Sequence, residues 1–178
     1  MIHDIDKGWL FHTHAWYLLH EIIKNIPTDG SVKTILDFGG GSGIAGSIIQ
    51  SVYPEIKVTV LDITDYYIDI WTKRKVNWHI IDEGETKVIF PDNTFDMVIS
   101  SHVLEHIENY KDTLSELVRV CKYKCLIVVP DGKVDDPTHK HIFNRKSFQE
   151  LFSKYSNSHT YPLYHPHINN LIGVINKC

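Results

Sequence analysis

Residues 34–46 contain the spacing most suggestive of chemistry. The apolar run Thr34–Leu36 ends at Asp37, and four of the next residues after Phe38, within the stretch 39–43, are glycines. Glycine in such a turn accepts a positive φ and lets the backbone approach a ligand closely, and the N–H groups of a following helix form an electropositive surface. The stretch therefore predicts a strand, a tight turn and a helix around a nucleotide-like cofactor.

Histidine is the second residue type that could carry chemistry. The 178 residues include 12 histidines, and six of these form three His-x-His pairs: His12/His14, His139/His141 and His165/His167. Imidazole has an ordinary pKa of ~6.5, which suits a general base, and it also suits zinc, nickel and copper. The pairs are candidates for either role, and the sequence alone assigns no metal.

The segment 102–106 also matches H-x-x-E-H, a pattern of zinc metalloproteases with both histidines about one helical turn apart. Here it follows an apolar strand-like run and does not open a long helix. Structural bracing by Glu105 and His106 is therefore favoured, with no metal expected. A metal-dependent hydrolase using His102 and His106 is kept as an alternative.

Strand-like and helix-like segments must position these residues. Apolar periodicity and turn residues predict elements along the whole chain. Helices are expected at 9–25, 44–52, 66–73, 112–121 and 147–152, and strands at 34–37, 57–61, 76–81, within 90–100, at 125–129, and as a closing pair at 158–164 and 171–175. We expect Ser147 to cap the last helix, with Glu150 completing a capping box. The alternation predicts parallel βαβ units.

Length and composition limit the possible classes of protein. A chain of 178 residues predicts a single domain over 1–178, with an N-terminal cover helix in 1–30 and an acceptor-side loop at 131–146. The net charge of −4 disfavours nucleic acid as a partner. Three cysteines without zinc-type spacing, and no apolar run long enough to span a membrane, lead us to expect a cytoplasmic protein that is not bound to a membrane. The oligomeric state is left open.

Two cofactor patterns overlap in the glycine turn. Residues 41–46 satisfy G-x-G-x-x-G, and Asp62 lies where a dinucleotide-binding protein would hold a ribose hydroxyl. Residues 37–43 also satisfy D-x-G-x-G-x-G, and residues 90–107 look very like the fourth-strand segment of small class I S-adenosylmethionine-dependent methyltransferases. The chain resembles that family strongly over about 34–130. A dinucleotide dehydrogenase would still need a catalytic domain, so the methyltransferase is favoured.

This resemblance implies a fold and a cofactor. The fold would be α/β and Rossmann-like, a mostly parallel sheet of about seven strands with an antiparallel C-terminal strand and helices on both faces. The cofactor would be S-adenosyl-L-methionine. By likeness, Asp37 and the backbone of Phe38, Gly39 and Gly41 would line its methionine portion, and the Ser100 carbonyl would face the ammonium group. Asp62 would accept from both ribose hydroxyls. Ile63 would lie against the adenine, and Asp82 would receive the adenine amino group with Glu83 beside it.

The resemblance implies less about the methyl acceptor. His102 follows a strand end, where ligands bind in open α/β sheets, and His141 lies in a histidine-plus-aromatic segment similar to one in small methyltransferases. These two are the candidate catalytic residues. We expect transfer to an oxygen or nitrogen of a small-molecule or sugar-like acceptor. A non-catalytic, cofactor-binding module of the same fold is the other alternative.

Overall fold

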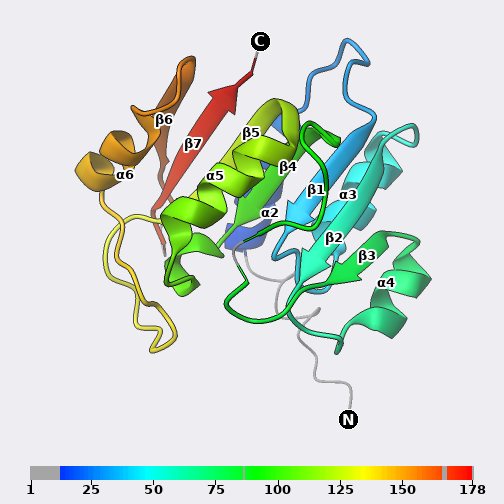
Figure 1. Ribbon diagram of the computed structural model, residues 1–178, viewed down its shortest axis with the longest axis horizontal. Coiled ribbons are helices and arrows are strands. Elements are labelled where there is room, and N and C mark those ends of the chain that lie inside the picture. Colours follow the sequence, from blue (N-terminus) through cyan, green and yellow to red (C-terminus); the bar gives the residue numbers. More distant parts are fainter. Residues whose placement is uncertain (1–12, 86, 166–167, 178) are drawn as a thin grey trace.

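Seven strands form one sheet in the order β3-β2-β1-β4-β5-β7-β6 (Figure 1). The structure is a computed structural model that describes residues 13–85, 87–165 and 168–177. The strands are β1 (Thr34–Phe38), β2 (Lys57–Asp62), β3 (Asn77–Ile80), β4 (Phe95–Ser101), β5 (Cys121–Pro130), β6 (Ser158–Leu163) and β7 (Asn170–Asn176). The helices are α2 (Thr13–Lys24), α3 (Ile44–Val52), α4 (Ile68–Arg74), the 3₁₀ turn η1 (Leu104–His106), α5 (Tyr110–Val120) and α6 (Arg145–Phe152).

The strand directions confirm the predicted fold class. Strands β1 to β5 pair in parallel, whereas β7 is antiparallel to both β5 and β6. The chain order reverses between β1 and β4, because β2 and β3 lie on one side of β1 and β4 and β5 on the other. Open α/β sheets bind ligands beyond the carboxyl ends of the strands at such a switch point. The residues that follow β1, β2 and β4 are therefore the first candidates for a ligand-binding site.

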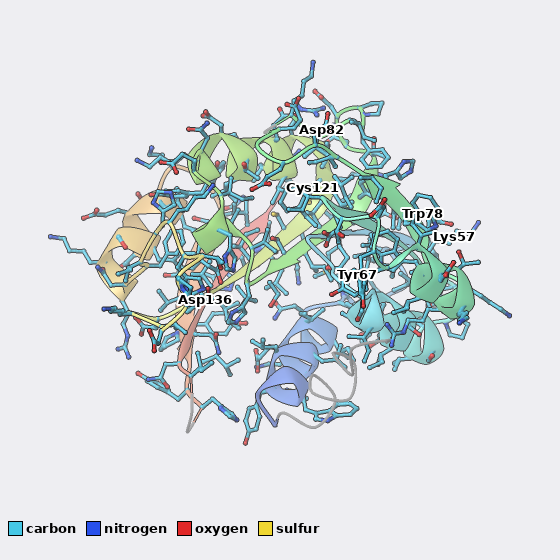
Figure 2. All side chains as sticks on the ribbon, turned by 90° about the horizontal axis from the view of Figure 1, so that it is seen from below. Lys57, Tyr67, Trp78, Asp82, Cys121 and Asp136 are labelled. Atoms are coloured by element: carbon cyan, nitrogen blue, oxygen red, sulfur yellow. The ribbon has the colours of Figure 1, made fainter. Side chains whose placement is uncertain are left out.

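Helices cover both faces of the sheet. On one face, α5 and α6 contribute Leu114, Leu117 and Phe148 to a buried apolar cluster, and on the other α2 contributes Leu18 and Ile22 to a second cluster. Figure 2, which views the molecule from below, shows α5 and α2 on opposite sides of the sheet. Because both faces are buried, the central strands are nearly continuous apolar runs, as expected of a parallel sheet.

Several predicted element boundaries differ from the observed ones, and two of the differences change how a helix is capped and where a strand starts. The cap of α6 is Asn144, whose side chain accepts from the Ser147 N–H at 3.0 Å while the Ser147 hydroxyl accepts from the Asn144 N–H at 3.1 Å. Ser147 therefore lies at the third helical position, and the predicted pairing with Glu150 does not form. Strand β5 begins at Cys121 and not at Cys125, since the chain passes from α5 into the strand without a loop.

Some expectations fall outside the described residues. The described part of the N-terminal cover helix is α2, so the start of the predicted helix 9–25 and His12 lie outside it, as do His167 and Cys178; of the His14 side chain nothing is described. The prediction of a single domain over 1–178 stays a prediction. Within the described ranges, the helices are all too short or too polar to cross a membrane.

Candidate cofactor and acceptor site

The turn after β1 has the backbone that its glycines predicted. Gly39, Gly41 and Gly43 have φ values of 70°, 51° and 72°. The Gly39 N–H donates to the Leu61 carbonyl at 2.7 Å, which ties the turn to β2. A Cβ at Gly39 would overlap the side chain of Val103, and one at Gly40 would come within 2.6 Å of Asp37 Oδ2. The glycines therefore keep the space above the ends of β1 and β2 open.

A pocket of about 680 Å³ lies beyond these strand ends. This volume is within the usual ~300–1,000 Å³ range of small-molecule sites. One part of its lining, which we call the carboxylate end, comprises Phe38, Gly39, Leu61, Asp62, Ile63, Ile81, Asp82, Glu83, Gly84 and Glu85. The other part, the histidine end, comprises His102, Val103, His106, Ile107, Glu108, Asn109, Pro137, Thr138 and Lys140.

Asp37 lies beneath the glycine turn and is almost fully buried, with 5% of its surface exposed. Within the part of the chain that the structure describes, its Oδ2 atom has no hydrogen-bond partner, and neither does the buried Oγ of Ser100 on the neighbouring strand β4. Burial, and secondarily the charge of Asp62, raise the pKa of Asp37 to about 7. A buried carboxylate with an unused acceptor fits a cationic or donor group of a bound ligand.

Asp62 ends β2 at the carboxylate end of the pocket. Its Oδ2 accepts from the Gly41 N–H at 2.9 Å, and its Oδ1 accepts from the Ile63 N–H at 2.8 Å. Oδ1 also accepts from the Thr64 N–H at 3.3 Å, so the remaining lone pair of Oδ2 is the acceptor left for a ligand. These backbone contacts fix the orientation of the Asp62 carboxylate at the pocket.

The remaining cofactor candidates of this end come from the loops that follow β2 and β3. Ile63 exposes 56% of its surface, and Asp82 and Glu83 are exposed at the pocket rim. Figure 2 labels Asp82, on the loop after β3, and Asp136, on the loop after β5. Phe38 and Gly39 join them in the lining, whereas Asp37, Gly41 and Ser100 are not among the lining residues.

His102 is held at the junction between β4 and the histidine end. It adopts φ 57°, and its N–H donates to the Val128 carbonyl at 2.9 Å. The ring Nε2 lies 2.9 Å from Asn170 Oδ1, and Nδ1 lies 3.5 Å from Glu105 Oε1. A non-glycine residue in the left-handed region indicates that tertiary contacts fix the backbone there. His102 thus reaches the pocket in a fixed orientation.

The structure does not bring His141 to the pocket. Its Nε2 lies 3.0 Å from the Glu108 carbonyl, and its ring makes an edge contact with Tyr110 at a centroid distance of 4.6 Å. It is absent from the lining residues. Its role as a general base stays a prediction, and the packing around it favours a structural role.

The residues grouped closely enough to hold a metal differ from those of the H-x-x-E-H pattern. Among the described residues they are Glu105, His106 and His139, and His102 is not part of the set. Glu105 has 1% of its surface exposed, and burial raises its pKa to about 7. The sequence brought Glu105 and His106 to notice, but only the folding of the 131–146 segment places His139 beside them.

Sequence reasoning missed several residues at the histidine end. Val103, Thr138 and Lys140 line the pocket although none was a site candidate, and His106 was a candidate only in the metal-dependent alternative. His106 follows the strand end by five residues, and the Lys140 N–H donates to the Glu105 carbonyl at 2.8 Å. The resemblance in residues 90–107 gave a signal for Val103 and His106, whereas Thr138 and Lys140 were covered only by the predicted acceptor-side loop at 131–146.

The comparison with protein families places the chain in one of them. Residues 36–129 match the family described as methyltransferase domain. The chain belongs to this family, and its fold is that of the class I S-adenosylmethionine-dependent methyltransferases. The matched residues begin inside β1 and end inside β5, so they contain the glycine turn, Asp62 and His102.

Curated relatives are similar over part of their length. The chain is 30% identical over 132 residues to ribosomal RNA small subunit methyltransferase C of Buchnera aphidicola, covering 70% of this chain and 38% of that protein. It is 28% identical over 149 residues to the ubiquinone/menaquinone biosynthesis C-methyltransferase UbiE of Hydrogenovibrio crunogenus, covering 79% and 58%. The chain thus spans less than two thirds of the length of these relatives, and their names cover two different acceptors.

Solved structures share the fold at low identity. An S-adenosylmethionine-dependent methyltransferase from Archaeoglobus fulgidus superposes with a TM-score of 0.74 at 17% identity, covering 90% of this chain and 93% of that one. A Haloferax volcanii structure, a complex of the Trm112 methyltransferase activator with a methyltransferase described as putative, gives 0.74 at 16% identity and coverages of 95% and 92%. At these identities the likeness supports the fold alone.

Proposed function

We propose that the chain is a methyltransferase that uses S-adenosyl-L-methionine to methylate an oxygen or nitrogen atom of a small-molecule or sugar-like acceptor. The observation that carries this proposal is the charge of the pocket. Among the described lining residues, Asp62, Asp82, Glu83, Glu85 and Glu108 are acidic and Lys140 is the one lysine or arginine. Such a pocket favours a ligand with positive charge and repels a pyrophosphate.

The residues present fit this cofactor. It carries a sulfonium and an ammonium group, which match the unpartnered Asp37 oxygen and the acidic lining. Its ribose offers two adjacent hydroxyl groups to Asp62, and its adenine can lie on the exposed Ile63, with Asp82 and Glu83 near its polar edge. The alternative of a dinucleotide is disfavoured because these carboxylates would face its phosphates.

When bound, the cofactor supplies a methyl group already activated for transfer to a nucleophile. The chain's own contribution is to hold the acceptor in line with the methyl carbon, which can lower the barrier by up to ~11 kcal/mol. His102 then accepts the proton of a hydroxyl or protonated amine. Its Nε2–H donates to Asn170 Oδ1, so Nδ1 is the accepting atom, and the Glu105 carboxylate 3.5 Å away stabilises the imidazolium.

The small-molecule acceptor is the finer part of this proposal. Pro137, Thr138 and Lys140 from the loop after β5 and His106 from η1 line the histidine end, and the Lys140 and His141 N–H groups both donate to the Glu105 carbonyl. This closure favours a compact acceptor. The curated relatives' names include a ribosomal RNA enzyme, so the expectation that nucleic acid is not a partner is not confirmed and enters the test.

The test measures binding of S-adenosylhomocysteine, the demethylated cofactor, by calorimetry and by the shift in melting temperature that any ligand of the native state produces. We expect one equivalent to bind. Replacing Asp62 with Ala should abolish the shift, whereas Asp65→Ala on the same loop, outside the pocket lining, should leave it unchanged. A screen of small-molecule acceptors and ribosomal RNA then follows methyl transfer. Absence of binding at saturating cofactor would overturn the proposal, and binding without transfer to any acceptor would favour the non-catalytic module.

A further inference from the structure

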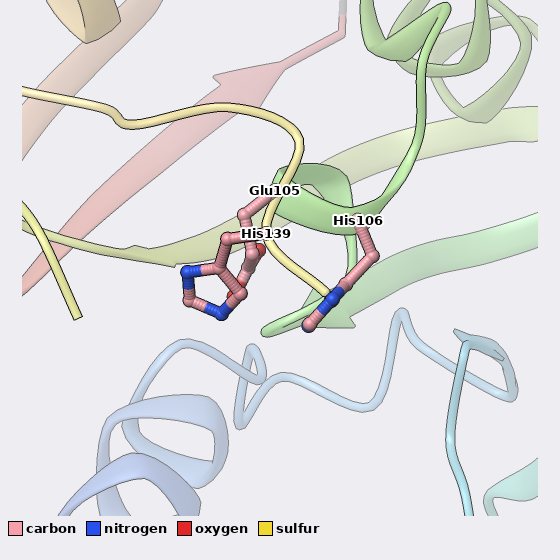
Figure 3. Close-up of side chains that lie close together, drawn as sticks. All are labelled: Glu105, His106 and His139. Atoms are coloured by element: carbon pink, nitrogen blue, oxygen red, sulfur yellow. The ribbon is translucent and has the colours of Figure 1, made fainter. Parts of the chain in front are cut away.

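Glu105, His106 and His139 form a compact group beside the histidine end (Figure 3). They come from η1 and from the segment after β5, and one potential ligand atom of each lies within 4.8 Å of the others. The Glu105 side chain is 1% exposed, and in the described parts of the chain neither carboxylate oxygen has a hydrogen-bond partner, the ion-pair contact of Oε1 with His102 Nδ1 being longer, at 3.5 Å. A carboxylate buried in this way normally has a donor or a cation against it.

The two imidazole rings are oriented by a single turn, residues 136–138. His106 Nδ1 lies 3.0 Å from Thr138 Oγ1, and His139 Nε2 lies 3.7 Å from Asp136 Oδ2. The Thr138 hydroxyl donates to Asp136 Oδ1 at 2.6 Å, so the two supporting residues also hold each other. Metal-binding histidines commonly have a carboxylate, hydroxyl or carbonyl against the second ring nitrogen, which fixes the ring and its tautomer.

The backbone joins the two segments that provide the ligands. The Lys140 and His141 N–H groups donate to the Glu105 carbonyl at 2.8 and 3.1 Å. The rings of His106 and His139 meet edge to face at a centroid distance of 4.7 Å. His106 and Thr138 also line the pocket, so an ion has a route to the group from the pocket side.

We propose that Glu105, His106 and His139 form a site for a divalent transition-metal ion of the zinc type, with an open coordination position toward the pocket. Two imidazoles and one carboxylate suit zinc, and three protein ligands with one open position are typical of sites where zinc contacts a substrate. Bonds of ~2.0–2.2 Å to a tetrahedral ion place ligands about 3.4 Å apart, so the side chains need to move inward by about an ångström. Metal binding does not depend on the proposed methyl transfer.

The test uses the full chain, stripped with a chelator and dialysed. Calorimetry with zinc chloride should give one site of micromolar or tighter affinity, and cobalt(II) should give the visible absorption of a four- or five-coordinate ion. We expect His139→Asn and Glu105→Gln each to weaken zinc binding at least ~10-fold. His159→Asn, an exposed histidine on β6, is the matched control and should bind zinc as the unmodified chain does.

Folding and cofactor binding are measured in the same samples. Melting temperature and S-adenosylhomocysteine affinity show whether each variant is folded, and Glu105→Gln keeps the side-chain shape if His139→Asn proves unstable. The proposal is overturned if the unmodified chain binds no zinc, or if folded variants bind it as before, which would indicate adventitious binding by other histidines or thiols. A chain that binds zinc but not the demethylated cofactor would instead overturn the proposed function alone.

Discussion

The two ends of the pocket are built in different ways. At the carboxylate end, backbone N–H groups fix Asp62, and Gly40 leaves open the space above Asp37 that a Cβ would fill. At the histidine end, side-chain contacts within and between η1 and the loop after β5 hold His102, His106 and Thr138. The first construction follows from strand ends and turns, which a sequence pattern encodes. The second depends on segments far apart in the sequence, which no local pattern encodes.

The largest expected effect separates the two candidate bases. Replacing His102 with Asn should lower kcat about 100-fold or more with the acceptor that the screen identifies, because general-base catalysis contributes ~10²–10⁴-fold. His141→Asn should leave kcat nearly unchanged, since its ring packs on Tyr110 outside the pocket lining. Steady-state kinetics with both variants makes the comparison. An unchanged kcat in His102→Asn would show that the acceptor loses its proton without this residue.

The next largest effect is expected where the carboxylate end of the pocket, at Gly39, contacts the histidine end, at Val103. Gly39→Ala should lower the free energy of unfolding by about 2–4 kcal/mol, because it combines an unfavourable φ of 70° with overlap against Val103. Gly41→Ala is the matched control. Its φ is also positive, but a Cβ there meets nothing within 4 Å, so the loss should be about 1 kcal/mol. Urea unfolding of both variants measures the difference, and equal losses would contradict the assigned contact.

Asp37 should give the cofactor-free chain a specific pH dependence. Its pKa is raised from 3.8 to about 7, so its protonated form stabilises the native state below pH ~4, and this stabilisation is lost as pH rises through about 7. From pH 5 to pH 8 the unmodified chain should therefore lose roughly 1–3 kcal/mol of unfolding free energy relative to Asp37→Asn. Urea unfolding at several pH values tests this, and parallel pH profiles for the two proteins would contradict it.

The smallest expected effect concerns α6, the helix that follows the loop after β5. Asn144→Ala removes the cap of α6 and should cost about 1 kcal/mol of unfolding free energy. Affinity for S-adenosylhomocysteine should stay the same, because Asn144 does not line the pocket. Thermal unfolding and calorimetry measure the two quantities. If the free energy of S-adenosylhomocysteine binding fell by more than the free energy of unfolding, α6 would have to position the cofactor site.

The difference between the carboxylate end and the histidine end of the pocket also explains how much could be predicted from the sequence. Strand order, the antiparallel β7 and the glycine turn follow from apolar runs, turn residues and the family pattern, and the structure confirms the predicted fold class. The placement of His139 beside Glu105, and of His141 on Tyr110, depends on how a loop without periodicity packs on η1. The cap of α6 was misplaced because Asn144 and Ser147 both favour the start of a helix, and only the backbone path decides between them.

The central claim is that the carboxylate end binds the cofactor and the histidine end faces its methyl group. A crystal structure of the chain with S-adenosylhomocysteine tests this directly. We expect the ribose hydroxyls to contact Asp62, the adenine to lie at Ile63, and the sulfur to point toward His102. A cofactor bound outside the pocket, or with its sulfur directed toward Asp82, would contradict the account.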